Sequence, residues 1–189
     1  MLVKAGVVII ALCSILGLVL LGNRNNLAHT IENNPVKKVV YLQTNVPTPN
    51  TSEKGIVTRV VDGDTFVIRL RNSELFKVRL IGVNAPESAD PRRKVQCYGK
   101  EASEYLRSQI ENKEVELVRD TSQRNRDKYD RLLRYVFMDS VNVGQELIEQ
   151  GFAYEHTYSI PYTYQPEFKN AQKNAQKNES GLWKKNACK

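Results

Sequence analysis

Three groups of charged residues lie at the ends of apolar strand patterns, in places that a packed core would not favour. They are the runs Val61–Thr65 (VDGDT), Val78–Glu87 (VRLIGVNAPE) and Arg126–Arg131 (RDKYDR). Carboxylates in such positions can hold a hard metal ion, and arginines can bind phosphate through two parallel hydrogen bonds. The combination indicates cleavage of a phosphodiester bond.

Phosphodiester hydrolysis makes distinct demands on side chains. The negative charge that builds on the phosphate in the transition state needs fixed hydrogen-bond donors. Arg79 and Arg131 suit this role because lysine cannot donate the same parallel pair. Water must also be oriented or deprotonated, and Glu87, which follows the rigid Pro86, is a candidate for this second role.

The sequence also offers oxygen ligands for a cation. Asp64 is one, and Asn84 and the backbone carbonyl of Ala85 follow about twenty residues later. Histidine is scarce, since the chain contains only His29 and His156. A zinc site or a histidine-based nuclease centre would need several histidines. We therefore expect a hard ion bound by oxygen.

Each of these elements also has an ordinary structural interpretation. Asp62-Gly63 is a common hairpin turn, Glu87 alone is typical of a solvated loop, and the segment 127–131 alone is an ordinary charged turn. Arg79 alone could be an exposed strand residue. The conjunction, in this order and at this spacing, is far more specific than any one part.

Periodic patterns predict the elements that position these residues. Alternating apolar residues predict strands over residues 56–61, 65–70, 75–83, 114–119 and 132–138. Helical periodicity predicts helices over residues 98–111, 143–150 and 166–178, the second of them capped by Asn142. Short strands interleaved with helices indicate a mainly β member of the α+β class. We predict a five-stranded, partly open OB-fold barrel with about three helices.

The third predicted strand carries Arg79. Phe76, Val78 and Leu80 share one face of this strand, whereas Arg79 lies on the other face with Lys77. We therefore expect the Arg79 side chain to leave the core from a rigid element.

Residues 5–22 form an uncharged run flanked by Lys4 and Arg24. A helix that spans a bilayer needs about 17–25 residues, and a secretory signal also contains an apolar run. No small-residue cleavage site follows, which favours an uncleaved N-terminal helix anchored in the membrane over a cleaved signal. Either interpretation makes the remainder extracytoplasmic, either membrane-anchored or secreted.

The composition changes again beyond this run. We predict an anchor or signal segment over residues 1–22, a flexible polar linker rich in Asn and Pro over residues 23–54, and a folded domain over residues 55–189. The formal net charge of +7 modestly favours a polyanionic partner and argues against a strongly cationic one.

The chain contains three cysteines. Cys13 lies in the uncharged run, which leaves Cys97 and Cys188 as an even pair in the folded region, and no C-x-x-C spacing indicates zinc. We interpret the pair as a disulfide that ties the C-terminus to the domain in an oxidising compartment. Two unrelated free thiols are the alternative.

Taken together, these motifs resemble the staphylococcal nuclease (thermonuclease) family. The resemblance extends from about Gly55 to Trp183. It rests on five motifs: VDGDT at residues 61–65, RLIGVNAPE at 79–87, YGKEA at 98–102, DKYDR at 127–131 and GLW at 181–183.

The resemblance implies an OB-fold, SNase-like domain and a calcium-dependent endonuclease. Such enzymes cut DNA and RNA with little sequence preference and leave 3′-phosphates. The family's catalytic arginines correspond to Arg79 and Arg131, and its catalytic glutamate corresponds to Glu87. Its first calcium aspartate corresponds to Asp64, and its carbonyl ligand corresponds to Ala85.

Two positions depart from the family pattern. Asn84 stands where the family has a second calcium carboxylate, and because calcium affinity follows the charge of the ligands, we expect weaker calcium binding. Asp130 stands where the family has glycine before the second arginine. Aspartate tolerates the left-handed conformation better than most residues, so we expect little harm.

Substrate contacts beyond the scissile phosphate are expected from Lys128, Tyr129 and Tyr158. Lysine can touch a neighbouring phosphate, and tyrosines can stack on the bases of single-stranded or denatured DNA and RNA. Loop packing is the alternative for the tyrosines. We expect a monomer. A non-catalytic OB-fold nucleic-acid-binding module tethered at the envelope, or an inert envelope protein, are the alternative functions.

Overall fold

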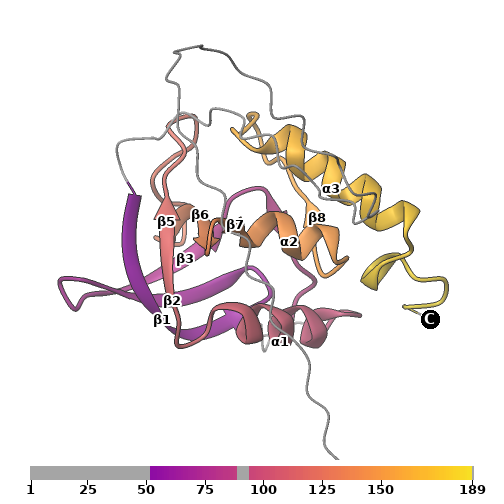
Figure 1. Ribbon diagram of the computed structural model, residues 1–189, viewed down its shortest axis with the longest axis horizontal. Coiled ribbons are helices and arrows are strands. Elements are labelled where there is room, and N and C mark those ends of the chain that lie inside the picture. Colours follow the sequence, from indigo (N-terminus) through magenta and orange to yellow (C-terminus); the bar gives the residue numbers. More distant parts are fainter. Residues whose placement is uncertain (1–51, 89–93, 189) are drawn as a thin grey trace, which may run out of the picture. The chain divides into compact units, whose positions relative to one another are not determined.

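The computed structural model describes residues 52–88 and 94–188 (Figure 1). The predicted N-terminal segment, residues 1–22, and most of the predicted linker lie outside these ranges. Among the described residues, no helix has both the length and the hydropathy that crossing a membrane requires.

Five strands close into a barrel. They are β1 (Ser52–Asp62), β2 (Thr65–Leu70), β3 (Leu75–Leu80), β5 (Glu114–Val118) and β6 (Leu132–Met138). Antiparallel pairing gives the order β3-β2-β1-β5-β6, and parallel pairing of β3 with β6 closes the cylinder. The mainly β, five-stranded barrel is therefore confirmed, and its closure is consistent with the OB fold.

The remaining elements cover the barrel and connect its strands. The helices are α1 (Gly99–Ile110), α2 (Val143–Glu149), α3 (Gln165–Lys177) and the 3-10 turn η1 (Gly181–Trp183). The short strands are β4 (Val83–Asn84), β7 (Val141–Asn142) and β8 (Tyr154–Glu155). Helix α1 packs against β1, and α2 packs against both β6 and α3 (Figure 1).

Local sequence explains the helices. The apolar stripe of α1 buries Ala102, Leu106 and Ile110, as its periodicity predicts. Helix α2 is capped by Asn142, whose Oδ1 accepts from the backbone N–H of Gly144 at 3.1 Å. Gly151, with a φ of 75°, follows α2 in the left-handed conformation that glycine adopts readily.

Two predicted strands differ from the structure. Strand β1 begins at Ser52 rather than at residue 56, because the segment Ser52–Ile56 pairs with β5. The strand predicted over residues 75–83 is broken by a turn at Gly82, which has a φ of 74°. A Cβ atom on Gly82 would clash with the ring of Tyr162, so this position has no room for a side chain. This turn redirects the chain toward Asn84 and Glu87.

The hairpin between β1 and β2 also differs in detail from the prediction. The two turn residues are Gly63 and Asp64, since Asp62 already pairs with Thr65. A Cβ atom on Gly63 would lie 2.7 Å from the Cβ of Ala85 and 2.8 Å from that of Ala102. Glycine at this position therefore lets the turn, the segment after β4 and α1 meet closely.

Candidate active site

Closure of the barrel brings the motif that contains Arg79 close to the motif that contains Arg131. In the parallel pairing of β3 with β6, Arg79 lies opposite Leu133, two residues after Arg131. The turn between β1 and β2 adds Asp64, whose backbone carbonyl accepts from the N–H of Leu80 at 3.0 Å. Residues far apart in the sequence thus meet at one end of the barrel.

Arg79 is buried, with a relative exposure of 5%. Its guanidinium forms an ion pair with Asp64, and Nη2 lies 3.2 Å from the Tyr158 hydroxyl and 3.5 Å from Oδ1 of Asn84. Burial lowers the pKa of Arg79 from its ordinary value, which the neighbouring Tyr158 opposes. Arg79 is buried although it lies outside the apolar core, because Tyr158 and Asn84 contact its guanidinium.

Within the described residues, the Nε atom of Arg79 is buried and has no hydrogen-bond partner. A buried donor without an acceptor is costly unless a ligand or water supplies one. The guanidinium therefore keeps a donor that a phosphate oxygen could use.

Asp64 is held by its neighbours on both oxygens. Oδ1 accepts from the Thr65 hydroxyl at 2.9 Å, and Oδ2 accepts from the backbone N–H of Ala85 at 3.0 Å. The bond to Ala85 ties the hairpin turn to the segment that carries Asn84. Contacts with Thr65 in β2, Arg79 in β3 and Ala85 after β4 thus fix the position of the carboxylate.

Arg131 is oriented by Asp127. The Nε and Nη2 atoms of Arg131 lie 2.7 Å and 2.6 Å from Oδ2 of Asp127, and Nη1 lies 3.2 Å from the Thr65 hydroxyl oxygen. Burial alone would raise the pKa of Asp127, but hydrogen bonds from Arg131 and from the Tyr129 backbone bring it below the usual value. Asp127 is therefore an anionic anchor for the guanidinium.

Thr65 connects the two arginines. Its hydroxyl donates to Asp64 and accepts from Arg131, so Arg79, Asp64, Thr65 and Arg131 form one continuous polar network. The sequence analysis does not predict Thr65 or Asp127 as site residues, although Thr65 ends the motif VDGDT and Asp127 begins the motif DKYDR. Only the pairing of distant strands reveals their role.

A pocket of about 540 Å³ opens beside this network. Its lining contains five basic side chains and one carboxylate, and it includes the predicted substrate residues Lys128, Tyr129 and Tyr158. The full lining is Arg79, Gln123, Arg124, Arg126, Asp127, Lys128, Tyr129, Arg131, Leu133, Tyr158, Ser159 and Ile160. Its charge and shape suit a polyanion with planar bases.

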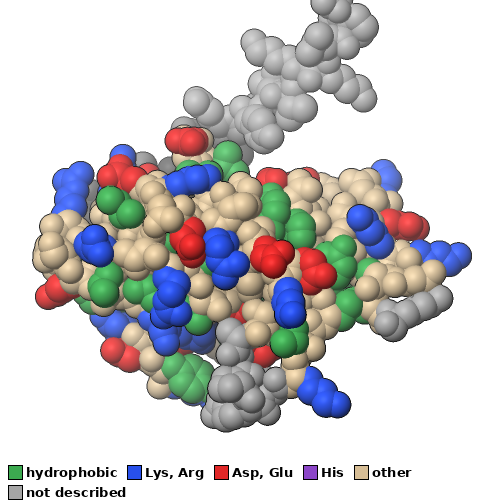
Figure 2. All heavy atoms as spheres, turned by 90° about the horizontal axis from the view of Figure 1, so that it is seen from below, with side chains coloured by type: hydrophobic (Ala, Val, Ile, Leu, Met, Phe, Trp, Pro, Cys, Tyr) green, Lys and Arg blue, Asp and Glu red, His purple; other side chains and the backbone are tan. Residues whose placement is uncertain are grey.

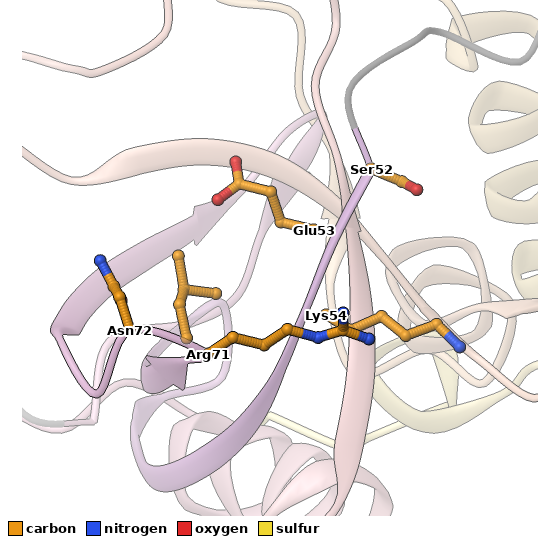
Figure 3. A pocket seen from close by; sticks show the side chains of 6 residues that line it. Ser52, Glu53, Lys54, Arg71 and Asn72 are labelled. Atoms are coloured by element: carbon orange, nitrogen blue, oxygen red, sulfur yellow. The ribbon is translucent and has the colours of Figure 1, made fainter.

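This concentration of basic side chains is local. Figure 2 shows a face of the molecule where Lys and Arg side chains are interspersed with Asp and Glu, so the net positive charge does not form one broad patch there. A second pocket, of about 500 Å³, lies between the start of β1 and the turn after β2 (Figure 3). It is lined by Glu53, Lys54 and Arg71, among others, and by none of the predicted site residues.

Glu87 does not line the basic pocket. Its carboxyl lies beside Asp62, two residues before Asp64 in the hairpin. Burial raises the pKa of Asp62, and the neighbouring Glu87 raises it further, while a hydrogen bond from Ser88 opposes the shift. Glu87 therefore belongs to an acidic pair, of which Asp62 interacts electrostatically with Arg79.

The structure brings the three residues predicted to bind calcium close together. Asp64 and Asn84 both contact the Arg79 guanidinium, and Ala85 is bonded to Asp64 through its N–H. Within the ranges 52–88 and 94–188, no three His, Cys, Asp or Glu side chains gather as a metal site. The donors fit Ca²⁺ in type but supply little charge, and a cation would share Asp64 with Arg79.

Two predictions are confirmed, the left-handed backbone of Asp130 and the pairing of two cysteines. Asp130 has a φ of 62°, the left-handed conformation that its position requires. Cys97 and Cys188 form the predicted disulfide, with their Cα atoms 5.6 Å apart. The bond joins the segment before α1 to the tail after η1.

Comparison with known proteins identifies the family. A family model described as "Staphylococcal nuclease homologue" matches residues 77–185. Thermonuclease from Staphylococcus hyicus is 36% identical over 127 residues, which are 67% of this chain and 73% of that protein. Thermonuclease from Staphylococcus intermedius is 36% identical over 133 residues, 70% of this chain and 77% of that protein.

A third relative carries a different name. The SPbeta prophage-derived endonuclease YokF of Bacillus subtilis is 33% identical over 134 residues, 68% of this chain and 43% of that protein. The family match covers more than half of the chain and includes both arginines of the network. These matches show that the chain belongs to the family of staphylococcal nuclease homologues.

Proposed function

We propose that this protein is an endonuclease that hydrolyses phosphodiester bonds of DNA and RNA with little sequence preference. The observation that carries the proposal is the network from Arg79 through Asp64 and Thr65 to Arg131, beside one basic pocket. Family membership, and relatives named thermonuclease and endonuclease, support the assignment to phosphodiester hydrolases.

In this proposal, Arg79 and Arg131 bind the scissile phosphate. Their guanidinium groups donate to its non-bridging oxygens and stabilise the charge that develops in the transition state. The environments of the two side chains support this role, since both are fixed before substrate binds. Preorganised donors of this kind need no reorganisation during the reaction.

Glu87 is the proposed general base. It accepts a proton from the attacking water, the oxygen of which forms a bond to phosphorus. Cleavage of the bond between phosphorus and the 5′-oxygen then leaves a 3′-phosphate, and the 5′-oxygen takes a proton from solvent to become a hydroxyl. Glu87 lies beside Asp62, whose charge acts on Arg79, and this relation supports the assignment.

Calcium is the proposed cofactor. Asp64, Asn84 and the carbonyl oxygen of Ala85 would hold it, with water completing the six to eight oxygen ligands that Ca²⁺ takes. When bound, the ion would offset negative charge on the phosphate. Because asparagine contributes no charge, half-saturation should need more calcium than a site with two carboxylates.

The rim of the pocket provides the proposed contacts to the rest of the substrate. Tyr129 and Tyr158 are 68% and 70% exposed, which suits stacking on the bases of single-stranded DNA or RNA. Lys128 would touch a neighbouring phosphate. The protein is proposed to act as a monomer.

We also propose that the protein acts outside the cytoplasm, secreted or anchored through residues 5–22. The disulfide between Cys97 and Cys188 supports this location, because such bonds persist in oxidising compartments. In this proposal, a linker joins residues 1–22 to the folded domain, the first strand of which begins at Ser52.

A cleavage assay tests the proposal. The full chain is incubated with denatured DNA at millimolar calcium, with and without a chelator, beside the variant Glu87→Gln. We expect acid-soluble fragments from the wild type alone, and only with calcium.

The alternative is a nucleic-acid-binding module without catalysis. Asn84 favours it, because it removes one carboxylate from the proposed calcium site. DNA binding by the folded wild type without any cleavage, at every calcium concentration, would favour this alternative and overturn the endonuclease.

A further inference from the structure

Both backbone hydrogen-bonding groups of Glu87 are bonded to Gln96. The N–H of Gln96 donates to the carbonyl oxygen of Glu87 at 2.8 Å, and the N–H of Glu87 donates to Oε1 of Gln96 at 2.8 Å. A single partner therefore satisfies both the donor and the acceptor of the Glu87 backbone. The side chain of Gln96 contributes one of these two bonds.

The first turn of α1 supports the other side of Glu87. A Cβ atom on Gly99 would lie 2.6 Å from the carbonyl oxygen of Glu87, so this close approach requires glycine. The N–H of Gly99 also donates to the carbonyl of Gln96 at 2.9 Å. Since α1 is anchored in the core through Ala102 and Leu106, Gly99 and Gln96 together restrict the position of the Glu87 backbone.

The disulfide begins at the next residue. Cys97 follows Gln96 directly and is bonded to Cys188, in the tail after η1. Turn η1 is itself fixed to the end of α2, because the N–H of Leu182 donates to the carbonyl of Gly151 at 2.8 Å. Both cysteines are exposed, so a small reductant can reach the bond.

We propose that Gln96 is a positioning residue for Glu87, and that the Cys97–Cys188 disulfide holds Gln96 in place, so that the rate of cleavage depends on the oxidation state of the disulfide. The inference rests on the proposed role of Glu87 as general base. Displacement of a catalytic group by about 1 Å can lower a rate by about a hundredfold. Phosphate binding by the arginines is independent of Gln96, so KM should change little.

Substitution of Gln96 is the first test. In the full chain, Gln96→Ala should lower kcat on single-stranded DNA by about tenfold or more, with KM within about twofold. Gln96→Glu should recover most of the rate, because it keeps an acceptor oxygen for the Glu87 N–H. Gln176→Ala, at an exposed position on α3, is the matched control and should behave as the wild type. Equal losses in the Ala and Glu variants, or a change in KM alone, would overturn the proposal.

Reduction of the wild-type chain is the second test. A dithiol such as dithiothreitol converts the disulfide into two thiols and is itself oxidised to a cyclic disulfide. A thiol assay counts the two new thiols, and near-UV circular dichroism verifies the fold. We expect kcat to fall to the value of the double variant Cys97→Ser, Cys188→Ser, which should not respond to the reductant, and to return after reoxidation.

This second test needs no substitution at Gln96, so it tests the dependence on the disulfide even if Gln96→Ala does not fold. An unchanged kcat in the fully reduced, folded chain would refute the dependence on the disulfide. Absence of cleavage by the oxidised wild type would instead contradict the proposed function. Cleavage that is indifferent to both Gln96 and reduction contradicts only the present inference.

Discussion

Arg79 and Arg131 are held in different ways, although both are proposed to bind the same phosphate. Arg79 is buried and paired with Asp64, so its charge also contributes to folding. Arg131 is partly exposed and is oriented by Asp127. Substitution of the two arginines should therefore have similar effects on catalysis and different effects on stability.

For Arg131, we expect the variant Arg131→Lys to lower kcat by about a hundredfold or more. Loss of one preorganised donor to a developing charge typically costs about 2.7–4 kcal/mol, and lysine cannot reproduce the planar fork. Steady-state cleavage of single-stranded DNA at saturating calcium measures kcat. Arg69→Lys, at an exposed position of β2, is the control. A rate close to that of the wild type would refute the role of Arg131.

For Arg79, we expect Arg79→Ala to lower the free energy of unfolding by about 3–5 kcal/mol, because Asp64 is left buried without its partner. Urea unfolding in the presence of a chelator measures this difference. The double variant Arg79→Ala, Asp64→Ala should recover part of the loss, since it removes the unpaired charge. A single variant as stable as Arg69→Ala would contradict the importance of the ion pair.

At the scale of elements, hydrogen bonds within the turn 126–131, before β6, orient Arg131. Oδ1 of Asp127 accepts from the backbone N–H groups of Tyr129 and Arg131, and Arg126 Nη1 donates to the carbonyl of Asp130 at 2.7 Å. These bonds fix the left-handed residue Asp130. The turn thus limits the directions that the Arg131 guanidinium can take.

The variant Asp127→Asn tests whether this turn orients Arg131. The amide keeps an acceptor oxygen but loses the charge, and hydrogen bonds to charged groups contribute about 1.5–3 kcal/mol. We expect kcat to fall by about tenfold with a smaller change in stability. Asp139→Asn, in an exposed turn, is the matched control. Identical kcat values for the two variants would show that Asp127 does not orient Arg131.

A second carboxylate connects two loops. Asp120 Oδ2 accepts from the Tyr135 hydroxyl at 2.5 Å and from the Thr163 N–H at 2.8 Å, and Oδ1 accepts from Ser122. Burial would raise the pKa of Asp120, but these hydrogen bonds bring it below its usual value of 3.8. The bonds hold the loop that carries Tyr158 near the pocket.

Because the pKa of Asp120 is lowered, its contribution to the free energy of unfolding should decrease as the pH falls. The folded state binds the proton less readily than the unfolded state, so this stabilisation is complete well above pH 3.8 and is lost as the pH falls through the folded pKa. Below pH 5, the free energy of unfolding of the wild type should therefore fall more steeply than that of Asp120→Asn. Urea unfolding at several pH values measures both slopes. Parallel slopes would refute the contribution of Asp120.

For the whole molecule, two long-range connections hold the site together. The pairing of β3 with β6 closes the barrel between the two arginines, and the disulfide links positions separated by 91 residues. The first connection determines where the site is. The second restricts the unfolded chain and connects the C-terminal tail to the segment before α1.

Removal of the disulfide should therefore have a large effect on stability. In the chain-entropy account, a cross-link closing about a hundred residues contributes about 4.7 kcal/mol. We expect the double variant Cys97→Ser, Cys188→Ser to lose on the order of 4 kcal/mol of unfolding free energy, measured by urea unfolding. Cys13→Ser, which leaves the pair intact, is the control. A loss no larger than that of Cys13→Ser would contradict this expectation.

Much of the fold follows from local sequence patterns. The periodicity predicts α1, β5 and β6 to within one residue, and the cap at Asn142 is predicted as it occurs. The break at Gly82 and the early start of β1 are missed, because the first depends on the Tyr162 ring and the second on pairing with β5. Such contacts join distant residues, so no local pattern reports them.

The sequence by itself determined the identities of the charged residues, their order, the parity of the cysteines and the strand pattern, because these are properties of the chain read in short windows. Only the tertiary structure decided that Arg79 is buried, that Thr65 connects the two arginines and that Glu87 lies beside Asp62. The physical reason is that burial and hydrogen-bond partners depend on which distant segments the closed barrel brings into contact.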